Sequence, residues 1–449
     1  MSQARISLHG LSVIVGEGNH VDDAGARAAF AVDGIVPQCA VFPRSEDEVA
    51  RVLKRAAESG LAVIPCRNAT KLGIGGVPQR YDVALGLKNL GEIRHFEPAD
   101  LTVSAEPGIE LAAFQRFLKP HRLWLPFDPP GAGRASLGGI VAANSSGPLR
   151  LKYGAPRDCV LGMKIATTDG KIVKTGGRVV KNVAGYDLSR LLTGSYGTLG
   201  VIVEISFKLF PLPALRSSWR VLVANLDSAH EFRRKILQSP LGPSRMALLD
   251  GAAAAFAHGN APDEFERDFE IWMEFSGSER VLERCAQTLG ELSQAAGVAA
   301  GALEDGAAEA GWERIADFSS ILPAGSGHLI VFRATLPIAS SEGFVGLIAC
   351  EAKKIGARCA CFCQNGVGIV RACLMPGELD SGLVAAVAKL RAEAVERGGA
   401  LVIEQCPAEM KKHVDVWGPA GNDFGLMRKL KELWDPKGTL SPGRFVGGL

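Results

Sequence analysis

The stretch "ASLGGIVAANSSGPLRLKYG", residues 135–154, places paired glycines and small side chains between segments of ordinary strand and helix pattern. Ser136 is a residue type that caps helices, and "LGGIVAAN" after it is expected to begin one. Gly138 and Gly139 let the main chain come into contact with a ligand, and the N–H groups of a helix start favour an anion. The stretch predicts main chain facing a phosphate or a flat ring, with a tightly packed helix start as the alternative.

A second tract of this kind precedes it, "IPCRNATKLGIGG" at 64–76. A strand is expected to end at Pro65, and the chain then turns through residues 67–70. Successive backbone N–H groups in such a turn form a concave anion site. The Thr70 hydroxyl and the charge of Lys71 or Arg67 would add to it. A plain turn is the alternative.

A third tract, "KNVAGYDLSRLLTGSYGTLGVIVEISFKLFP", follows at 181–211. Polar residues including Asn182 and Asp187 lie on a tight loop, and glycines precede a strand, which again allows close approach of the backbone. A helix, a turn and a strand with no ligand is the alternative.

The elements around these tracts form two sets. "CAVFP", a helix capped by Ser45 and "LAVIPC" form a βαβ pattern, so the two strands are expected to be parallel neighbours. Asp169-Gly170 lies between alternating runs and predicts a hairpin. The prolines at 211–213 mark the expected domain boundary.

Beyond that boundary, strand patterns alternate with helical patterns, which predicts an α+β layer. The Ala/Gly-rich segment 297–311 is expected to be a flexible crossover. The helical patterns lie at 228–238, 279–296, 342–355 and 378–398.

Composition excludes several classes of function. Fifty basic residues nearly balance 48 acidic ones, and a net charge of +2 gives no reason to expect nucleic acid or a membrane surface as a partner. No uncharged apolar run approaches the ~18 residues that span a bilayer, so no transmembrane segment is expected. The ten cysteines include no CxxC pair, and the opening residues lack a secretory pattern, so a cytoplasmic protein with reduced thiols is expected.

The three tracts together, in this order and spacing, resemble the FAD-binding domain of the vanillyl-alcohol oxidase superfamily, the PCMH type. "LKYGAPRDCVLGMKIATTDGKIVKTGG" (151–177) with "KNVAGYDLSRLLTGSYGTLGVI" (181–202) is similar to the FAD-linked 2-hydroxy-acid dehydrogenases. Within that group it most resembles the FAD-binding subunits of bacterial glycolate oxidases. The tail "WDPKGTLSPGR" (434–444) is similar to the family's closing motif.

This resemblance implies an α+β fold. A PCMH-type FAD-binding domain of two α+β subdomains would cover 1–212, and a ferredoxin-like α+β domain would cover 213–449. FAD would be non-covalent, because Thr70 stands where some relatives bond the flavin through a His. The residues implied to bind FAD are Arg67, Asn68, Ala69, Thr70, Lys71, Ser136, Gly138, Gly139, Asn144, Ser145, Gly197, Gly200 and Ile202.

The chain also departs from the family. The first loop carries "CRNAT" where relatives have glycines, and any position with positive φ is expected to be strained except at Asn68. Fully catalytic relatives carry histidines in "GHxGDGNLH" and a later "EHG". This chain has "CQNGVGIVRACL" (363–374) and "VWGPAGNDFG" (416–425), so no metal site of that kind is expected.

Candidate catalytic groups are therefore cations and an amide near the expected flavin: Lys181, Asn182 and Arg444, with Arg157 close to them. A cation there would stabilise reduced flavin or hold a carboxylate, although structural ion pairing is the alternative for each. The cysteines of "CACFC" (359–363) fall on one strand face and are interpreted as small core residues, not metal ligands.

The function implied by the resemblance is that of an FAD-dependent oxidoreductase subunit in a glycolate oxidase-type complex. It would oxidise a 2-hydroxy acid (glycolate to glyoxylate) and would not be catalytic alone. The implied partners are a catalytic FAD-linked flavoprotein subunit and an iron–sulfur subunit, with attachment to the inner membrane through these partners as a further option. A non-catalytic assembly subunit and a stand-alone FAD-dependent hydroxy-acid or alcohol oxidase remain as alternatives.

Overall fold

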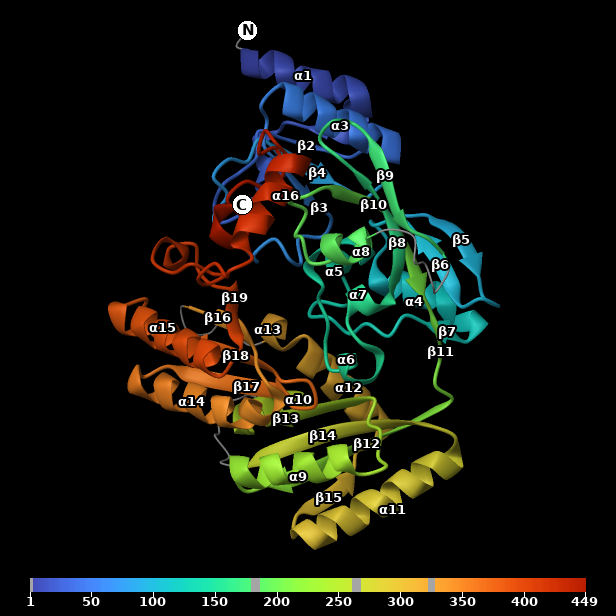
Figure 1. Cartoon of the computed structure of the whole chain (residues 1–449), viewed down its shortest axis with the longest axis vertical. Helices are drawn as coiled ribbons and strands as arrows, with labels where there is room; N and C mark the ends of the chain where they lie inside the picture. Colours follow the sequence, from blue (N-terminus) through green and yellow to red (C-terminus); the bar gives the residue numbers. More distant parts are fainter. Residues whose placement is uncertain (1–2, 179–185, 261–267, 322–327) are drawn as a thin grey trace.

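A computed structural model describes residues 3–178, 186–260, 268–321 and 328–449. The N-terminal half forms the upper body in Figure 1, and the C-terminal half forms the lower body. The chain passes from one to the other between β11 (Phe210–Pro211) and β12 (Leu215–Val223). Helices and strands are mixed in both halves, which confirms the predicted α+β class.

The first sheet has the strand order β1-β2-β4-β3 and builds the top of the upper body. Helix α3 (Glu46–Glu58) begins as expected, with the Ser45 side chain accepting a hydrogen bond from the backbone N–H of Glu48. α1 (Gln3–Val15) packs against α3. The strands are β1 (His20–Val21), β2 (Cys39–Val41), β3 (Val63–Cys66) and β4 (Val83–Gly86).

One expectation about this sheet is wrong. β2 and β3 do run in the same direction, because each pairs in parallel with β4, but β4 lies between them. The α3 crossover fixes the relative direction of the two strands it joins. It leaves open whether a later strand enters the space between them.

The second sheet is antiparallel, with the order β5-β6-β10-β8-β9. The turn at Asp169-Gly170 joins β8 to β9, as predicted, and Gly170 has φ +83°. Helices α4 (Leu111–Leu118) and α5 (Leu137–Ala143) pack on this sheet in one hydrophobic core. The strands are β5 (Ile93–Glu97), β6 (Thr102–Ala105), β8 (Val160–Ala166), β9 (Ile172–Gly176) and β10 (Val201–Lys208).

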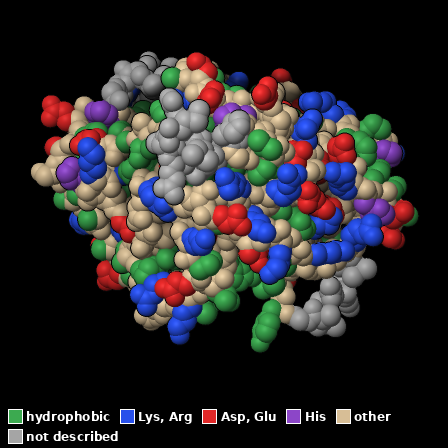
Figure 2. Space-filling model, turned by 90° about the horizontal axis from the view of Figure 1, so that it is seen from above, with side chains coloured by type: hydrophobic (Ala, Val, Ile, Leu, Met, Phe, Trp, Pro, Cys, Tyr) green, Lys and Arg blue, Asp and Glu red, His purple; other side chains and the backbone are tan. Residues whose placement is uncertain are grey.

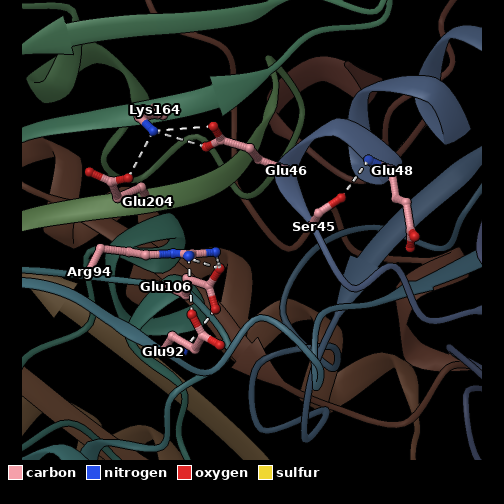
Figure 3. A network of polar contacts seen from close by, with 8 residues as sticks. All are labelled: Ser45, Glu46, Glu48, Glu92, Arg94, Glu106, Lys164 and Glu204. Atoms are coloured by element: carbon pink, nitrogen blue, oxygen red, sulfur yellow. Dashed lines mark hydrogen bonds and ion pairs between the residues drawn. The ribbon is translucent and has the colours of Figure 1, made fainter.

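Ion pairs join the two subdomains of the upper body (Figure 3). Lys164 Nζ on β8 lies 3.0 Å from Glu204 Oε2 on the neighbouring strand and 3.1 Å from Glu46 Oε2 at the start of α3. The same lysine therefore holds the start of α3 in one subdomain to the sheet of the other. In the second sheet, the Arg94 guanidinium pairs with Glu106 and with Glu92.

The lower body is a single antiparallel sheet with the order β15-β12-β14-β13-β17-β18-β16-β19. One face packs against α9 (Leu226–Gln238), α14 (Ser341–Lys354) and α15 (Ser381–Glu396). The other face packs against α10 (Gly251–Ala257) and α12 (Asp305–Ala316). The remaining strands are β13 (Arg245–Leu249), β14 (Phe269–Gly277), β15 (Ala299–Ala302), β16 (Ile330–Thr335), β17 (Arg358–Gln364), β18 (Ile369–Met375) and β19 (Ala400–Gln405).

The flexible crossover expected at 297–311 is wrong. Residues 299–302 form the edge strand β15, which pairs with β12 from Trp219↔Ala302 to Leu222↔Ala299, and α12 begins at Asp305. Alanine and glycine are poor strand formers. The strand forms because β12 offers an open edge, and no local pattern shows that edge.

The C-terminal segment returns to the upper body. α16 (Phe424–Trp434), drawn in red, lies beside the N-terminal half in Figure 1, and Leu440 makes a parallel bridge to Val63 of β3. Lys431 Nζ, which is buried, donates to Thr198 O at 2.8 Å and pairs with Asp435. The tail is therefore part of the first domain's structure.

The surface carries charges of both signs. Figure 2 shows Lys and Arg side chains interspersed with Asp and Glu side chains over the face seen from above. Among the helices of the described residues, none combines the length and the apolar character needed to cross a bilayer.

Candidate cofactor and active site

The three sequence tracts meet in space around two adjoining cavities. One, of about 90 Å³, is lined by Pro65–Arg67, by Ser136, Gly138 and Gly139, and by the segment 195–202 with Gly197, Gly200 and Ile202. The other, of about 100 Å³, shares Pro65, Gly139 and Tyr196 with it and adds Ala69, Thr70, Lys71 and Arg444. Segments more than 100 positions apart in the chain therefore line one groove.

The two adjacent glycines of α5 have different roles. A Cβ on Gly138 would lie 2.6 Å from Pro107 Cβ, so this glycine is required by packing within the protein. A Cβ on Gly139 would meet only Ser136 Oγ, at 3.3 Å, and its other side faces the cavity. Ser136 caps α5 by accepting a hydrogen bond from Gly139 N. The packing alternative thus holds for Gly138, and the ligand interpretation fits Gly139.

The turn after β3 contains a residue with a strained backbone. Ala69 has φ +59°, so the positive φ falls on a residue for which strain is expected, and not on Asn68. The Asn68 side chain is used elsewhere: its Nδ2 donates to Glu110 Oε1 at 2.6 Å and to Arg134 O at 2.7 Å. Arg67 also pairs with Glu110, at 3.4 Å. The left-handed conformation costs an L-residue about 1–2 kcal/mol, and these side-chain contacts hold it in place.

At the other end of α5, Asn144 and Ser145 occupy distinct positions. Asn144 ends the helix with φ +46° and accepts a hydrogen bond from Arg157 N at 3.2 Å. Ser145 lines a larger cavity of about 510 Å³. Asn144 therefore shapes the segment, while Ser145 can contact a ligand.

This larger cavity lies between the two bodies of the protein. The upper body contributes residues 68–71 and Arg134, and the lower body contributes Asp317, Val331 and Glu404. Lys71 Nζ donates to Pro130 O at 2.6 Å. Burial lowers the pKa of Lys71 to about 8, against the attraction of Glu404. A lysine with this pKa can hold or release a proton near neutral pH.

Two guanidinium groups flank the Glu404 carboxylate beside this cavity. Arg333 Nε lies 2.8 Å from Glu404 Oε1, and Arg371 Nε lies 3.4 Å from Glu404 Oε2. Burial by itself raises the pKa of Glu404, but Arg371, Arg333 and Lys71 outweigh it and hold the pKa below its ordinary value. With Arg134, which lines the cavity, these three cations outnumber the carboxylates of Glu404 and Asp317, so this end of the cavity attracts an anion.

Arg444 and the two remaining catalytic candidates have different outcomes. The Arg444 guanidinium donates to Gly76 O at 2.9 Å and to Ile74 O at 2.6 Å, and it lies 3.5 Å from Asp33. This geometry favours holding the loop 72–76 over acting on reacting atoms. Lys181 and Asn182 lie outside the described residues.

The cysteines of "CACFC" lie on β17, with Cys361 and Cys363 fully buried. The thiols of Cys359 and Cys361 and a carboxylate oxygen of Asp250 lie within 4.8 Å of one another. The Asp250 carboxylate accepts hydrogen bonds from Ala253 N and Cys361 N, so it caps α10 and ties β13 to β17. These two hydrogen bonds give the Asp250 carboxylate a structural role, which explains why it lies beside the cysteines.

Sequence reasoning missed Arg333, Arg371 and Glu404. A spacing signal was available for Arg371, because Gln364 and Arg371 stand seven residues apart, as do the histidines of "GHxGDGNLH". The structure also brings Glu404 within 3.4 Å of Arg371.

The comparisons with known proteins agree with this architecture. Residues 37–176 match the FAD binding domain family, and residues 212–445 match the C-terminal domain family of FAD linked oxidases. Glycolate oxidase subunit GlcD of Bacillus subtilis is 27% identical over 96% of this chain and 95% of its own length. Glycolate oxidase subunit GlcE of Escherichia coli is 36% identical over 44% of this chain and 51% of its own length.

Solved structures show the same fold. p-Cresol methylhydroxylase superposes with a TM-score of 0.78 at 15% identity, covering 98% of this chain and 96% of that one. Alkyldihydroxyacetonephosphate synthase gives 0.77 at 18%, covering 98% and 84%. Because the C-terminal family model alone covers more than half of the sequence, the chain belongs to the FAD-linked oxidases and is an FAD-dependent oxidoreductase with the PCMH-type fold.

Proposed function

We propose that this protein oxidises a small 2-hydroxy acid, with glycolate as the first candidate. The observation that carries the proposal is the group of Lys71, Arg333 and Arg371 around Glu404, beside the cavity between the two bodies, where cations outnumber carboxylates. A substrate carboxylate would supply the missing negative charge through charge-assisted hydrogen bonds. The relatives, which include glycolate oxidase subunits and a D-2-hydroxyglutarate dehydrogenase of Stutzerimonas stutzeri, point to the same substrate class.

The groove fits FAD. The main chain of residues 67–71 and the start of α5 would hold the pyrophosphate, because N–H groups and an open Gly139 meet there. Tyr196 and Gly197 would lie along the cofactor. When bound, FAD supplies the acceptor for the hydride. It is held without a covalent bond: Thr70 forms none, and burial raises the pKa of the Cys66 thiol to about 12, which keeps it unreactive.

Different residues around the cavity would bind the substrate and accept its proton. Arg333 and Arg371 orient the carboxylate. Glu404 is a poor base because the surrounding cations hold its pKa down. Lys71 Nζ, with a pKa of about 8, is suited to take the proton of the substrate hydroxyl. Ser145 and Asp317 line the space in which the substrate would lie.

We further propose that the protein works in the cytoplasm as one chain of a glycolate oxidase-type complex, attached to the inner membrane only through its partners. Those partners would be a second FAD-linked flavoprotein and an iron–sulfur chain that carries electrons onward. The match to subunit GlcE supports this view. The alternative is turnover by the isolated chain, and the grouping of Lys71, Arg333 and Arg371 around Glu404 within this one chain favours it.

One experiment tests both. The chain is purified alone and together with its neighbouring gene products, and flavin content and glycolate-driven dye reduction are measured in each. Flavin in both samples and dye reduction in the assembled one is the expected result. Dye reduction by the isolated chain supports the alternative, whereas a colourless protein that refuses FAD leaves only an assembly role.

A further inference from the structure

Several buried polar groups on or directly after strands β17 and β18 lack hydrogen-bond partners among the described residues. Gln364 and Asn365 are 1% and 0% exposed, and their side-chain oxygens and nitrogens have no hydrogen-bond partner among the described residues. Nη1 of Arg371 likewise has no hydrogen-bond partner, and its Nε makes no hydrogen bond although it lies 3.4 Å from Glu404 Oε2 as an ion pair. Native proteins rarely leave such groups unsatisfied, so each one indicates a polar ligand or an ordered water.

Arg371 and Gln364 lie on the sheet face that bounds the cavity, and Asn365 follows directly after the end of β17. Arg371 is in register with Phe362 on one side and with Arg333 on the other. Gln364 is two residues beyond Phe362, so it lies on the same face as Arg371 and diagonal to it. Arg371 Nη2 donates to Ser146 O at 3.2 Å, next to the cavity-lining Ser145.

These residues do not fit a divalent cation. Gln364 and Arg371 stand where the relatives' motif has two histidines, and Gly366 and Gly368 match its glycines. A guanidinium keeps its proton at all relevant pH values and has no lone pair for a metal. The Arg371 guanidinium also forms an ion pair with the neighbouring carboxylate of Glu404.

We propose that Arg371, with the amides of Gln364 and Asn365, forms a metal-free pocket for the polar end of a short 2-hydroxy acid. This inference rests on the proposed function. The guanidinium supplies a fixed positive charge where relatives have metal-binding histidines. The two amides offer both donors and acceptors to the substrate's 2-oxygen and carboxylate. Arg371 and Gln364 thereby select small, highly polar substrates over larger apolar alcohols.

Oxalate is a suitable probe because it carries carboxylate oxygens on both carbons and is not oxidised by hydride loss. The FAD-loaded protein is titrated with oxalate, with and without EDTA, and the change in flavin absorbance gives Kd. Equal Kd values in both conditions are expected. Arg371→Lys should raise Kd at least tenfold, while the exposed Arg234→Lys, the matched control, should leave it unchanged.

Gln364→Leu distinguishes binding from a structural role. It removes the unpaired amide and keeps a similar volume, so the apo protein should melt at the same or a higher temperature while oxalate binds at least fivefold more weakly. A lower melting temperature with unchanged oxalate binding would overturn the proposal. Because this variant is expected to fold, the test does not depend on Arg371→Lys being stable.

The outcomes separate this inference from the proposed function. Loss of oxalate binding in EDTA overturns the metal-free pocket, even if glycolate still reduces the flavin in metal-containing buffer. EDTA-resistant binding that depends on Arg371 upholds the pocket, even if neither glycolate nor other 2-hydroxy acids reduce the flavin.

Discussion

Lys411 Nζ lies 2.8 Å from Asp33 Oδ1, and the two side chains, 378 positions apart, are only 2% and 8% exposed. Lys411 also donates to the carbonyls of Gly73 and Gly75 at 2.9 Å. Arg444 approaches the other oxygen of Asp33 and bonds the same loop. One buried carboxylate thus positions two cations that hold residues 72–76, directly after the turn assigned to the pyrophosphate.

Replacing Asp33 with Asn should therefore damage both stability and cofactor binding. Removing one partner of a buried ion pair costs about 3–5 kcal/mol, and here two cations lose their charge partner. Urea denaturation should show a loss of this order, and purified protein should contain less FAD. The exposed Asp227→Asn is the control and should change neither. Full FAD content in Asp33→Asn would mean that the loop is held without this carboxylate.

The adjacent glycines of α5 should respond differently to alanine. Gly138→Ala places a Cβ against Pro107 and should destabilise the apo protein by about 1–3 kcal/mol. Gly139→Ala has room for its Cβ and should leave apo stability within about 1 kcal/mol, because alanine favours a helix, while weakening FAD binding. Thermal denaturation of the apo proteins and FAD titration measure the two effects. Unaltered FAD affinity in Gly139→Ala would remove α5 from the cofactor site.

Ala69 offers a test of the strained turn. Glycine takes a φ near +59° freely, so Ala69→Gly should relieve about 1 kcal/mol of strain, partly offset by a more flexible unfolded chain. Ala69→Val should lower stability and FAD content together, because a β-branched residue tolerates this conformation poorly. FAD content that is the same in both variants would argue against contact between the turn and the cofactor.

Lys71 predicts a specific pH dependence. Its pKa falls from 10.5 to about 8 on burial, so between these values the unfolded chain binds more protons than the folded one. Stability contributed by this group therefore rises with pH through that window, and the cost of burying the charge is fully present below pH 8. Lys71→Met should raise the free energy of unfolding at pH 7 and show no advantage above about pH 10.5.

Lys71 should also determine how the rate of flavin reduction depends on pH. If its neutral amine takes the hydroxyl proton, glycolate-driven flavin reduction should increase up to about pH 8 and then level off. Lys71→Met should lose most of this reduction, and Lys71→Arg should not restore it, because arginine stays protonated. Stopped-flow reduction measured across pH 6–10 gives the profile. A flat profile in the parent protein would exclude Lys71 as the base.

Local sequence patterns predicted the elements of the fold well. Ser45 and Ser136 cap helices where expected, and Asp169-Gly170 makes its hairpin, because each depends on a few neighbouring residues. The position of β4 and the edge strand β15 were not predictable in this way. Both depend on which distant strand offers an open edge.

The candidate site shows the same division. The FAD-facing tracts could be found because small residues cluster in the sequence around Gly139 and Gly197. The group of Arg333, Arg371 and Glu404 could not, because it is assembled by strand register: a bulge between Val331 and Phe332 shifts β19 against β16 at Glu404. Likewise, Asn68 was the better residue for a positive φ by itself, but its amide is bound to Glu110.

The return of the tail to β3 sets an order of events during synthesis. Val63 donates to Thr439 O at 2.7 Å and accepts from Ser441 N at 2.9 Å. When only the first 212 residues have been synthesised, β3 therefore still lacks its hydrogen bonds to residues 439 and 441. The cavity assigned to FAD is completed only after translation has passed residue 444, so the vitamin-derived cofactor should be captured after that point and not while the first domain is being synthesised.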